Sequence, residues 1–225
     1  MKVNRADPVE SDTGRMTRRT QAQRTAATRA VLIEAARKLF AEKGFADVST
    51  QTIVAAAGVT RGALYHQFDD KAALFAAVYE DVERDLVTDI AARIMAAQPL
   101  DPLEAMGVGA RLFLDRCVAP DVQQIVLIDA PAVLGWDRWR AVGTKYGLGV
   151  IEGMLAHAIA EGAIPEQPLR PTAHVLLSAL DEAALFISRA SDPDKARAEM
   201  TEVCDRVIGG IAGVQVKPSR RHRQC

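Results

Sequence analysis

The sequence has few aromatic residues and no long apolar run, and these two absences limit the kind of protein it can encode. Phe, Trp and Tyr make up only 5% of the 225 residues, whereas 49% are hydrophobic. Ala and Leu are prominent among them, which favours helices over sheets. No stretch of about 18 apolar residues occurs, so the sequence predicts no membrane span. We also expect no signal peptide, because residues 1–27 are polar.

Cysteine is also scarce, and the signature motifs of common enzymes are missing. Three cysteines are scattered along the chain without C-x-x-C spacing, which indicates reduced thiols and predicts a cytoplasmic protein. No H-E-x-x-H, P-loop or G-x-S-x-G motif is present. None of the four histidines follows a Glu by three residues, as the helix-bundle di-iron pattern requires. We therefore predict no enzymatic activity, no cofactor and no metal site.

Positive charge is concentrated near the N-terminus. Residues 15–71 contain ten Lys and Arg against five acidic residues, whereas residues 76–225 contain sixteen basic against twenty-one acidic residues. The net charge of −1 conceals this division. A basic end on an otherwise acidic chain is typical of a protein that contacts nucleic acid phosphates at one end only.

Residues 49–68 have the pattern of two short helices joined by a tight turn. Ser49 or Thr50 can cap the first helix, because each hydroxyl can accept a hydrogen bond from a free backbone N–H group. Gly58 can end that helix in the left-handed conformation, and Thr60 can cap the second helix. This arrangement predicts a helix-turn-helix, although an ordinary helical hairpin would have the same spacing.

The second of these helices carries side chains suited to DNA. Arg61 can donate two hydrogen bonds to a guanine. Gly62 and Ala63 have almost no side chain, so the helix could lie close to base edges. The full set of expected DNA contacts is Thr50, Thr60, Arg61, Gly62, Ala63, Tyr65, His66 and Lys71.

The run GVTRGALYHQFDDKAALF at residues 58–75 resembles the TetR family of bacterial transcriptional regulators. The family pattern combines a Gly-Val turn, a recognition helix with a Leu-Tyr-aromatic/His-x-Phe core, and Lys-x-x-Leu at the start of a long helix. The segment ARKLFAEKGF at residues 36–45 also matches. This resemblance implies an all-α protein, with an N-terminal three-helix helix-turn-helix DNA-binding domain and a C-terminal helical domain for ligand binding and dimerisation.

We divide the chain into four segments. Residues 1–27 are expected to be a disordered basic arm, whose arginines are either solvated or reach the minor groove and nearby phosphates. Residues 28–88 are the helix-turn-helix DNA-binding domain together with the start of a linking helix. Residues 89–215 are the effector-binding and dimerisation domain, and residues 216–225 are a basic tail.

Apolar periodicity predicts the remaining helices of both domains. A first helix should begin at Thr28 and stop at Gly44. A long helix over residues 71–97 should cross from the first domain into the second. The further helices are expected near residues 103–118, 120–131, 132–162, 171–190 and 193–213.

The resemblance also implies a small-molecule pocket in the second domain. Asp181 and Glu182 are candidate polar anchors, because a carboxylate inside an apolar helix is costly unless it is paired. Such a group needs an ion pair with another helix or a ligand. The expected effector-binding residues are Phe113, Cys117, Trp136, Trp139, Met154, His157 and Asp181, and for each of them ordinary packing is the alternative.

The last two helices are expected to form a two-fold contact with a second copy of the chain. One recognition helix touches only a few base pairs, and two of them spaced about 34 Å apart can read a palindrome. The expected interface residues are Leu180, Ala183, Ala184, Ile187, Val203, Val207 and Ile211.

These observations predict a homodimeric, sequence-specific DNA-binding transcriptional regulator. We favour a repressor that a small, largely apolar effector releases from a palindromic DNA operator. One alternative is an all-helical enzyme, which the missing motifs disfavour. The other is a relative of the family whose DNA binding has a structural or adaptor role.

Overall fold

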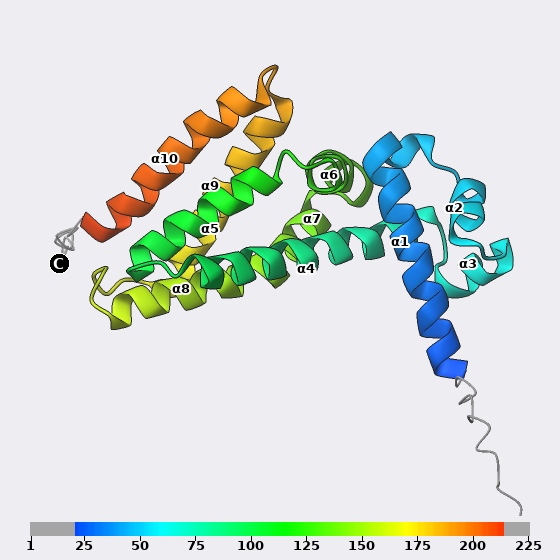
Figure 1. Cartoon of the computed structure of the whole chain (residues 1–225), viewed down its shortest axis with the longest axis horizontal. Helices are drawn as coiled ribbons and strands as arrows, with labels where there is room; N and C mark the ends of the chain where they lie inside the picture. Colours follow the sequence, from blue (N-terminus) through cyan, green and yellow to red (C-terminus); the bar gives the residue numbers. More distant parts are fainter. Residues whose placement is uncertain (1–20, 214–225) are drawn as a thin grey trace, which may run out of the picture.

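The computed structural model describes residues 21–213, which form helices without any strand (Figure 1). The prediction of an all-α protein is therefore confirmed. Within the described range no helix combines the length and hydropathy needed to cross a membrane. The elements are α1 (Gln21–Asp47), α2 (Thr50–Ala57), α3 (Arg61–Gln67), α4 (Lys71–Ala97), α5 (Pro102–Arg116), η1 (Val122–Asp129), α6 (Ala130–Leu134), α7 (Trp136–Gly143), η2 (Thr144–Leu148), α8 (Gly149–Ala160), α9 (Leu169–Arg189) and α10 (Pro193–Gly213), where η1 and η2 are π-helical.

Helices α1, α2 and α3 and the first turns of α4 form a separate unit at one end of the molecule, here called the head (Figure 1). Its core consists of fully buried apolar side chains from all four helices, including Leu32, Phe40, Ile53, Leu64 and Phe75. The rings of Phe40 and Phe75 meet edge to face with their centroids 5.3 Å apart, a favourable aromatic geometry. This core fixes α3 relative to α1 and α4.

The first helix begins earlier than predicted. We expected it to start at Thr28 after a disordered arm, but α1 already begins at Gln21. Residues 21–27 include three alanines, which are strong helix formers, and contain no Gly or Pro that would stop the helix. Gly44 interrupts the helix as predicted, with a left-handed φ of 76°. The rest of the predicted arm, residues 1–20, and the predicted tail lie outside the described residues.

Helix α4 joins the head to the rest of the molecule. Its 27 residues follow the predicted range of 71–97, and at 1.5 Å per residue they span about 40 Å. Leu74 and Tyr79 pack in the head-side core, and Val82 and Leu86 continue the same buried face into the body. We call α5 to α10, together with η1, η2 and the C-terminal part of α4, the body. Because α4 belongs to both units, a shift in the body can tilt the head.

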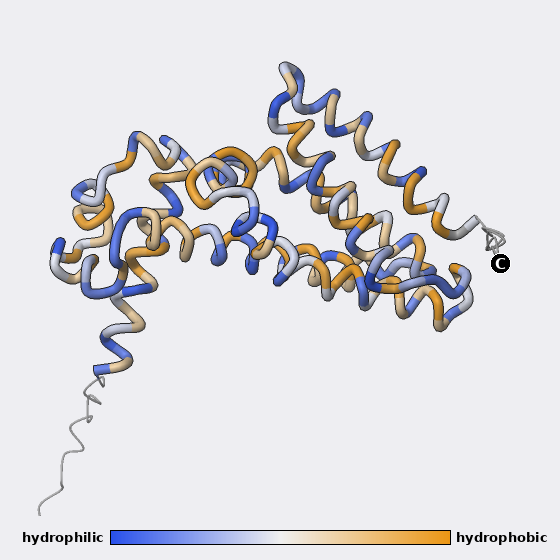
Figure 2. The backbone as a smooth tube through the Cα atoms, turned by 180° about the vertical axis from the view of Figure 1, so that it is seen from behind, coloured by the Kyte–Doolittle hydropathy of each residue, from blue (hydrophilic) through white to orange (hydrophobic). Residues whose placement is uncertain are grey.

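The middle of the body is more divided than the sequence indicated. We expected a single helix over 132–162, but this stretch contains α6, α7, η2 and α8. Gly135, with φ of 80°, separates α6 from α7. Figure 2 shows hydrophobic and hydrophilic residues alternating along α10, as expected for a helix that buries only one face. The interior between these helices is where a ligand site could form.

Candidate nucleic-acid interface and ligand cavity

The helix-turn-helix is held by the caps that its sequence predicted. Ser49 is the N-cap of α2, and its Oγ accepts a hydrogen bond from the backbone N–H of Thr52 at 3.1 Å. Gly58 ends α2 in the left-handed conformation, with φ of 64°. Thr60 is the N-cap of α3, and its Oγ1 accepts a hydrogen bond from the N–H of Ala63 at 3.2 Å. These local bonds fix the angle between the two helices.

Helix α3 lies at the outer end of the head (Figure 1) and presents polar groups to solvent. It is anchored by Leu64, which is fully buried, and by Phe68 at its C-cap. The exposed side of α3 carries Arg61, Tyr65 and His66, and the Arg61 guanidinium lies 5.5 Å from the centre of the Tyr65 ring. Of the other expected contacts, Thr60 and Gly62 are exposed and Thr50 and Ala63 are half-buried.

Lys71 does not present a free ammonium group to DNA phosphates. Its Nζ donates hydrogen bonds to the carbonyl oxygens of Phe45 at 2.8 Å and Val48 at 3.0 Å. It also lies 4.0 Å from the centre of the Phe45 ring, a cation–π contact. The interpretation of Lys71 therefore changes, from a phosphate contact to a side chain that locks the α1–α2 connection onto the start of α4.

A network of ion pairs around Arg37 of α1 joins the head to the body. The guanidinium contacts carboxylate oxygens of Asp85 at 2.6 Å, Asp121 at 2.8 Å and Asp81 at 3.3 Å. Burial raises the pKa of Asp121, but the Arg37 hydrogen bond, the charges of Arg116 and Arg37 and the Val122 N–H together outweigh burial and hold that pKa below its usual value. In addition, Asp129 of η1 accepts a hydrogen bond from the N–H of Phe45 at 2.7 Å. Both α4 and η1 thus contact the head.

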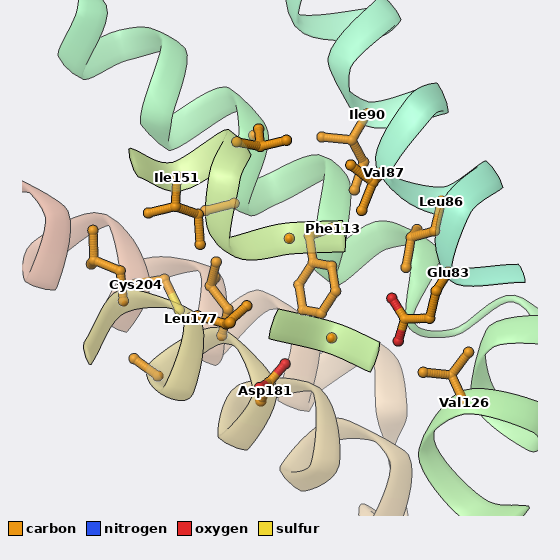
Figure 3. A pocket seen from close by; sticks show the side chains of 18 of the residues that line it. Glu83, Leu86, Val87, Ile90, Phe113, Val126, Ile151, Leu177, Asp181 and Cys204 are labelled. Atoms are coloured by element: carbon orange, nitrogen blue, oxygen red, sulfur yellow. The ribbon is translucent and has the colours of Figure 1, made fainter. Parts of the chain in front are cut away.

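The body contains a cavity of about 120 Å³ between α4, α5, η1, α7, α8, α9 and α10. Its wall is mostly aliphatic and aromatic, as is typical of a site for a small organic molecule. Figure 3 shows side chains converging from several helices, among them Leu86, Ile90, Phe113, Val126, Ile151 and Leu177. Because α4 and η1 supply part of this wall, the cavity touches the same two elements that contact the head.

Three charged side chains interrupt this apolar wall. Asp181 of α9 forms an ion pair with Arg140 of α7. Glu83 of α4 is only 8% exposed and is the one charged residue buried to this degree within residues 21–213. The hydroxyl of Tyr79, which also lines the cavity, donates its proton to the carbonyl oxygen of Trp139 at 2.9 Å. The cavity is therefore apolar with a small acidic patch.

Two family models match this chain. The model described as "Bacterial regulatory proteins, tetR family" matches residues 32–78, and the model described as "Tetracyclin repressor-like, C-terminal domain" matches residues 103–211. The crystal structure of a TetR-family transcriptional regulator from Pectobacterium atrosepticum is 31% identical, with a TM-score of 0.77, and the match covers 87% of this chain and 99% of that one. This chain belongs to the TetR family of transcriptional regulators.

Other proteins match this chain over shorter stretches or with lower identity. The regulator CymR of Pseudomonas putida is 34% identical over 119 residues, and the regulator AcrR of Shigella flexneri is 36% identical over 91 residues. These matches cover 52% and 40% of this chain but only 59% and 41% of those relatives. The structure of RolR in complex with resorcinol is 22% identical with a TM-score of 0.64, covering 88% of this chain and 98% of that one, a likeness that shows the fold alone.

Membership of the TetR family makes this chain a DNA-binding transcriptional regulator, since the matched N-terminal model is the helix-turn-helix of that family. The family is not enzymatic, so the prediction that the chain is not an enzyme is confirmed by the match. Within the described residues, no group of three or more His, Cys, Asp or Glu side chains is arranged to hold a metal ion.

The cavity of this TetR-family regulator includes four of the seven predicted residues. Phe113, Trp139, Met154 and Asp181 line it. The ion pair between Asp181 and Arg140 also provides the partner that the sequence required for a carboxylate inside α9.

The other three predicted residues lie elsewhere. Cys117 is fully buried, but it sits at the C-cap of α5, one turn beyond Phe113, and packs in the core. Trp136 is 56% exposed at the start of α7, where its ring rests against Trp139 with centroids 4.7 Å apart. His157 faces solvent because Leu155 and Ala158 occupy the buried positions of α8. These three assignments to the pocket are corrected.

The sequence analysis missed Glu83, which is the most buried charged group between residues 21 and 213. Its spacing could have revealed it, because Glu83 lies four residues after Tyr79 and three before Leu86, and residues three and four apart share one helix face. The periodicity of α4 therefore placed a carboxylate on the apolar side of that helix.

Most of the predicted interface residues of the regulator are not available to a partner. Ala183, Ala184 and Ile187 are at most 3% exposed and pack inside their own chain, because α9 uses that face to bury the body core. Leu180 and Ile211 are half-buried and pack against the chain's own core. Only Val203 and Val207, 48% and 41% exposed, keep a position where a partner could contact them.

Proposed function

We propose that this chain is a homodimeric repressor, that its two heads bind a palindromic operator, and that a small, largely apolar effector in the body cavity releases it. The observation that carries the proposal is the position of α3. The helix is anchored on one side by Leu64 and Phe68 and is otherwise exposed, with Arg61 and Tyr65 facing outward. A helix presented in this way can enter a major groove.

Gly62 supports close contact between α3 and DNA. A Cβ added at this position would meet only the Oγ1 of Thr60, at 3.9 Å. Nothing in the described part of the protein therefore requires a glycine at this helical position, although Gly destabilises a helix by about 1 kcal/mol relative to Ala. A partner outside the protein, the base edges of an operator, explains the missing side chain.

We therefore expect Gly62→Leu to abolish operator binding while leaving the fold intact or slightly more stable. The added side chain points into open space in the free protein but would clash with a bound duplex. The measurement is an electrophoretic mobility shift assay combined with thermal unfolding. Gly209→Leu, at another exposed helical glycine without neighbouring atoms, serves as the control. Operator binding by Gly62→Leu with unchanged affinity would contradict the close approach.

A dimer requires an exposed apolar face, and the last two helices have one. Val175 and Phe186 of α9 are 65% and 48% exposed and lie eleven residues apart, which is close to three full turns. Val203 and Val207 of α10 are four residues apart and also exposed. We propose that these four residues, rather than the buried set predicted from sequence, contact the second chain.

Val203→Asp should convert the dimer to a monomer at micromolar concentrations, because it places a charge in an apolar contact. Sedimentation velocity gives the oligomeric state directly. The matched control is Val31→Asp, which changes an apolar head residue that is 41% exposed and should leave the dimer intact. A monomeric native protein, or a fully dimeric Val203→Asp variant, would rule out this interface.

Helix α4 and η1 both line the cavity and contact the head, so they provide a route by which an effector could release the protein from DNA. Val122, Val126 and Leu127 of η1 line the cavity. Asp121 at the N-cap of η1 and Asp129 at its end bind Arg37 and Phe45 of the head. π-helical segments of this kind are frequent at functional sites. An effector that displaces η1 or α4 would tilt each head and change the spacing between the two copies of α3.

The size of the cavity indicates a compact effector. At about 120 Å³ it is slightly smaller than an apolar cavity of about 150 Å³ that binds benzene. RolR, whose fold is similar, was solved with resorcinol, which also has one ring. To shift the protein from mostly operator-bound to mostly free, such a molecule must bind the released form more tightly than the operator-bound form by about 5.5 kcal/mol.

The experiment that tests the proposal is selection of DNA fragments from the source genome by the purified protein. We expect it to retain a small set of fragments that share a palindrome, and to release them on addition of a one-ring organic compound. Retention of all fragments alike would contradict sequence-specific regulation. Stable retention in the presence of every compound that binds the cavity would contradict effector release.

A further inference from the structure

Glu83 is a buried carboxyl group without a cationic partner among residues 21–213. It extends from α4 into the cavity, towards Phe113 and the carboxyl of Asp181 (Figure 3). Among the described residues no Lys, Arg or His forms an ion pair with it. The nearby Tyr79 hydroxyl donates a hydrogen bond to the Trp139 carbonyl oxygen and also interacts with the Glu83 carboxyl, but it carries no positive charge. A charged group in such a position is costly unless something pairs with it.

The charges around the cavity do not balance. Glu83 and Asp181 supply two carboxyl groups, and Arg140 supplies the only Lys or Arg side chain of its described lining. Arg140 is already occupied, since it forms an ion pair with Asp181 and a hydrogen bond with the Oγ of Ser178. With Glu83 ionised the cavity therefore lacks one positive charge, in a wall that is otherwise apolar.

We propose that the effector is a small amphipathic cation, with an apolar body of about one ring among the aliphatic side chains and a protonated amine bound to Glu83. This inference rests on the proposed function, because it takes the cavity to be the effector site. It adds the chemical class of the effector. The ammonium group would supply the missing charge and donate hydrogen bonds to the carboxylate, and charge-assisted bonds of this kind are the stronger ones.

The position of Glu83 also connects the bound amine to the head. Glu83 lies on α4 between Asp81 and Asp85, the two residues that pair with Arg37 of α1. The same two turns of helix thus face the ligand on one side and the head on the other. A displacement of α4 at Glu83 would therefore alter the ion pairs that hold the head.

The protonation of Glu83 gives the proposal a pH signature. Burial raises the pKa of Glu83 to about 7, Asp181 acts in the same direction, and the Tyr79 hydroxyl opposes them. Burial likewise raises the pKa of Asp181 to about 6, against the opposing effect of Arg140. Burial also holds the pKa of the Cys117 thiol, at the end of α5, far above its usual value. On α10, Cys204 also lines the cavity, and burial raises the pKa of its thiol. The lining residues from α5, η1, η2 and α8 are not titratable.

Amine binding should weaken as the pH falls through 7. The ammonium group needs the ionised carboxylate, and a Glu83 with a pKa of about 7 is mostly ionised at pH 8 and mostly protonated at pH 6. We expect the affinity for a permanently protonated amine to fall about tenfold between these two values. Neutral ligands of the same shape should show little change over the same range.

The test compares three compounds of nearly equal size, benzylamine, benzyl alcohol and ethylbenzene. Isothermal titration calorimetry on the DNA-free full-length protein gives their dissociation constants at pH 8 and pH 6. We expect benzylamine to bind at least about tenfold more tightly than the other two at pH 8. The variant Glu83→Gln should lose this preference and the pH dependence, while still binding ethylbenzene.

The matched control is Glu80→Gln, which removes a carboxylate one turn earlier on α4. Glu80 lies outside the cavity and pairs with Lys145 at 3.0 Å, so this variant should keep the preference for benzylamine. The inference would be overturned if the neutral compounds bound as tightly as benzylamine or more tightly. It would also be overturned if Glu83→Gln kept the preference for benzylamine, or if none of the three compounds bound. Benzylamine that binds the cavity but leaves the operator complex intact would instead count against the proposed release mechanism.

Discussion

Replacing Arg61 with Ala should abolish the preference of the protein for its operator over unrelated DNA. The guanidinium is exposed at the start of α3, beside the Tyr65 ring, where it can donate two hydrogen bonds to one guanine. One such contact contributes about 1–3 kcal/mol of discrimination. A dimer makes two, so we expect a loss of about 2–6 kcal/mol. Competition between labelled operator and an unrelated duplex at fixed salt measures this ratio.

A control variant that removes one positive charge far from α3 distinguishes recognition of base edges from the general attraction of positive charge to DNA. Arg93→Ala does this, because Arg93 lies near the body end of α4 and pairs with Asp89 at 3.0 Å. It should leave the ratio of operator to nonspecific affinity unchanged. If Arg61→Ala also kept that ratio, another residue of the head would have to read the sequence.

Replacing Arg37 with Ala should destabilise the protein by about 2–4 kcal/mol. This is less than the roughly 3–5 kcal/mol for a fully buried pair, because the network is only partly buried, with Asp85 52% exposed. The substitution leaves the carboxylates of Asp81, Asp85 and Asp121 close together without their shared cation. Their mutual repulsion acts directly on the contact between head and body. The free energy of unfolding from urea titrations measures the loss.

The adjacent Lys38 provides the control for this measurement. Its side chain is 71% exposed and forms an ion pair with Glu34 one turn away, at 2.8 Å. Exposed pairs of this type contribute about 0.3–0.5 kcal/mol, so Lys38→Ala should be nearly neutral. Losses of equal size in the two variants would show that the Arg37 network does not hold the head to the body.

The helix-turn-helix could be predicted from sequence because its determinants are local. Ser49, Gly58 and Thr60 each act on backbone groups within a few residues, and the structure places each at the predicted helix end. The length of α4 was predictable for a related reason, since its apolar period continues without a break over 71–97. Capping residues and apolar periodicity are therefore sufficient to predict the part of the molecule that positions α3.

The contacts between distant segments could not be predicted in the same way. The sequence predicts a phosphate contact for Lys71, but its partners are the carbonyls of residues 45 and 48, and no local pattern reveals such a bond. Arg37 pairs with carboxylates 44 to 84 residues away. Glu83 was detectable from its helical spacing, although the acidic character of the cavity also depends on α7 and α9.

The error in the dimer interface has a simple physical cause. The small and apolar residues of α9 show that one face of this helix is buried, but periodicity does not reveal what covers it. In the structure the chain's own core covers Ala183, Ala184 and Ile187. The exposed Val175 and Phe186 lie on another side of the helix, where the apolar pattern is sparse.

The central claim is that two copies of α3 enter successive major grooves on one face of a duplex. Hydroxyl-radical footprinting on a retained operator, combined with methylation interference at guanine N7, tests it most directly. The account predicts two symmetric protected regions centred about 34 Å apart, each containing a guanine whose methylation blocks binding by the native protein but not by Arg61→Ala. A single protected region, or interference that is the same for both proteins, would contradict it.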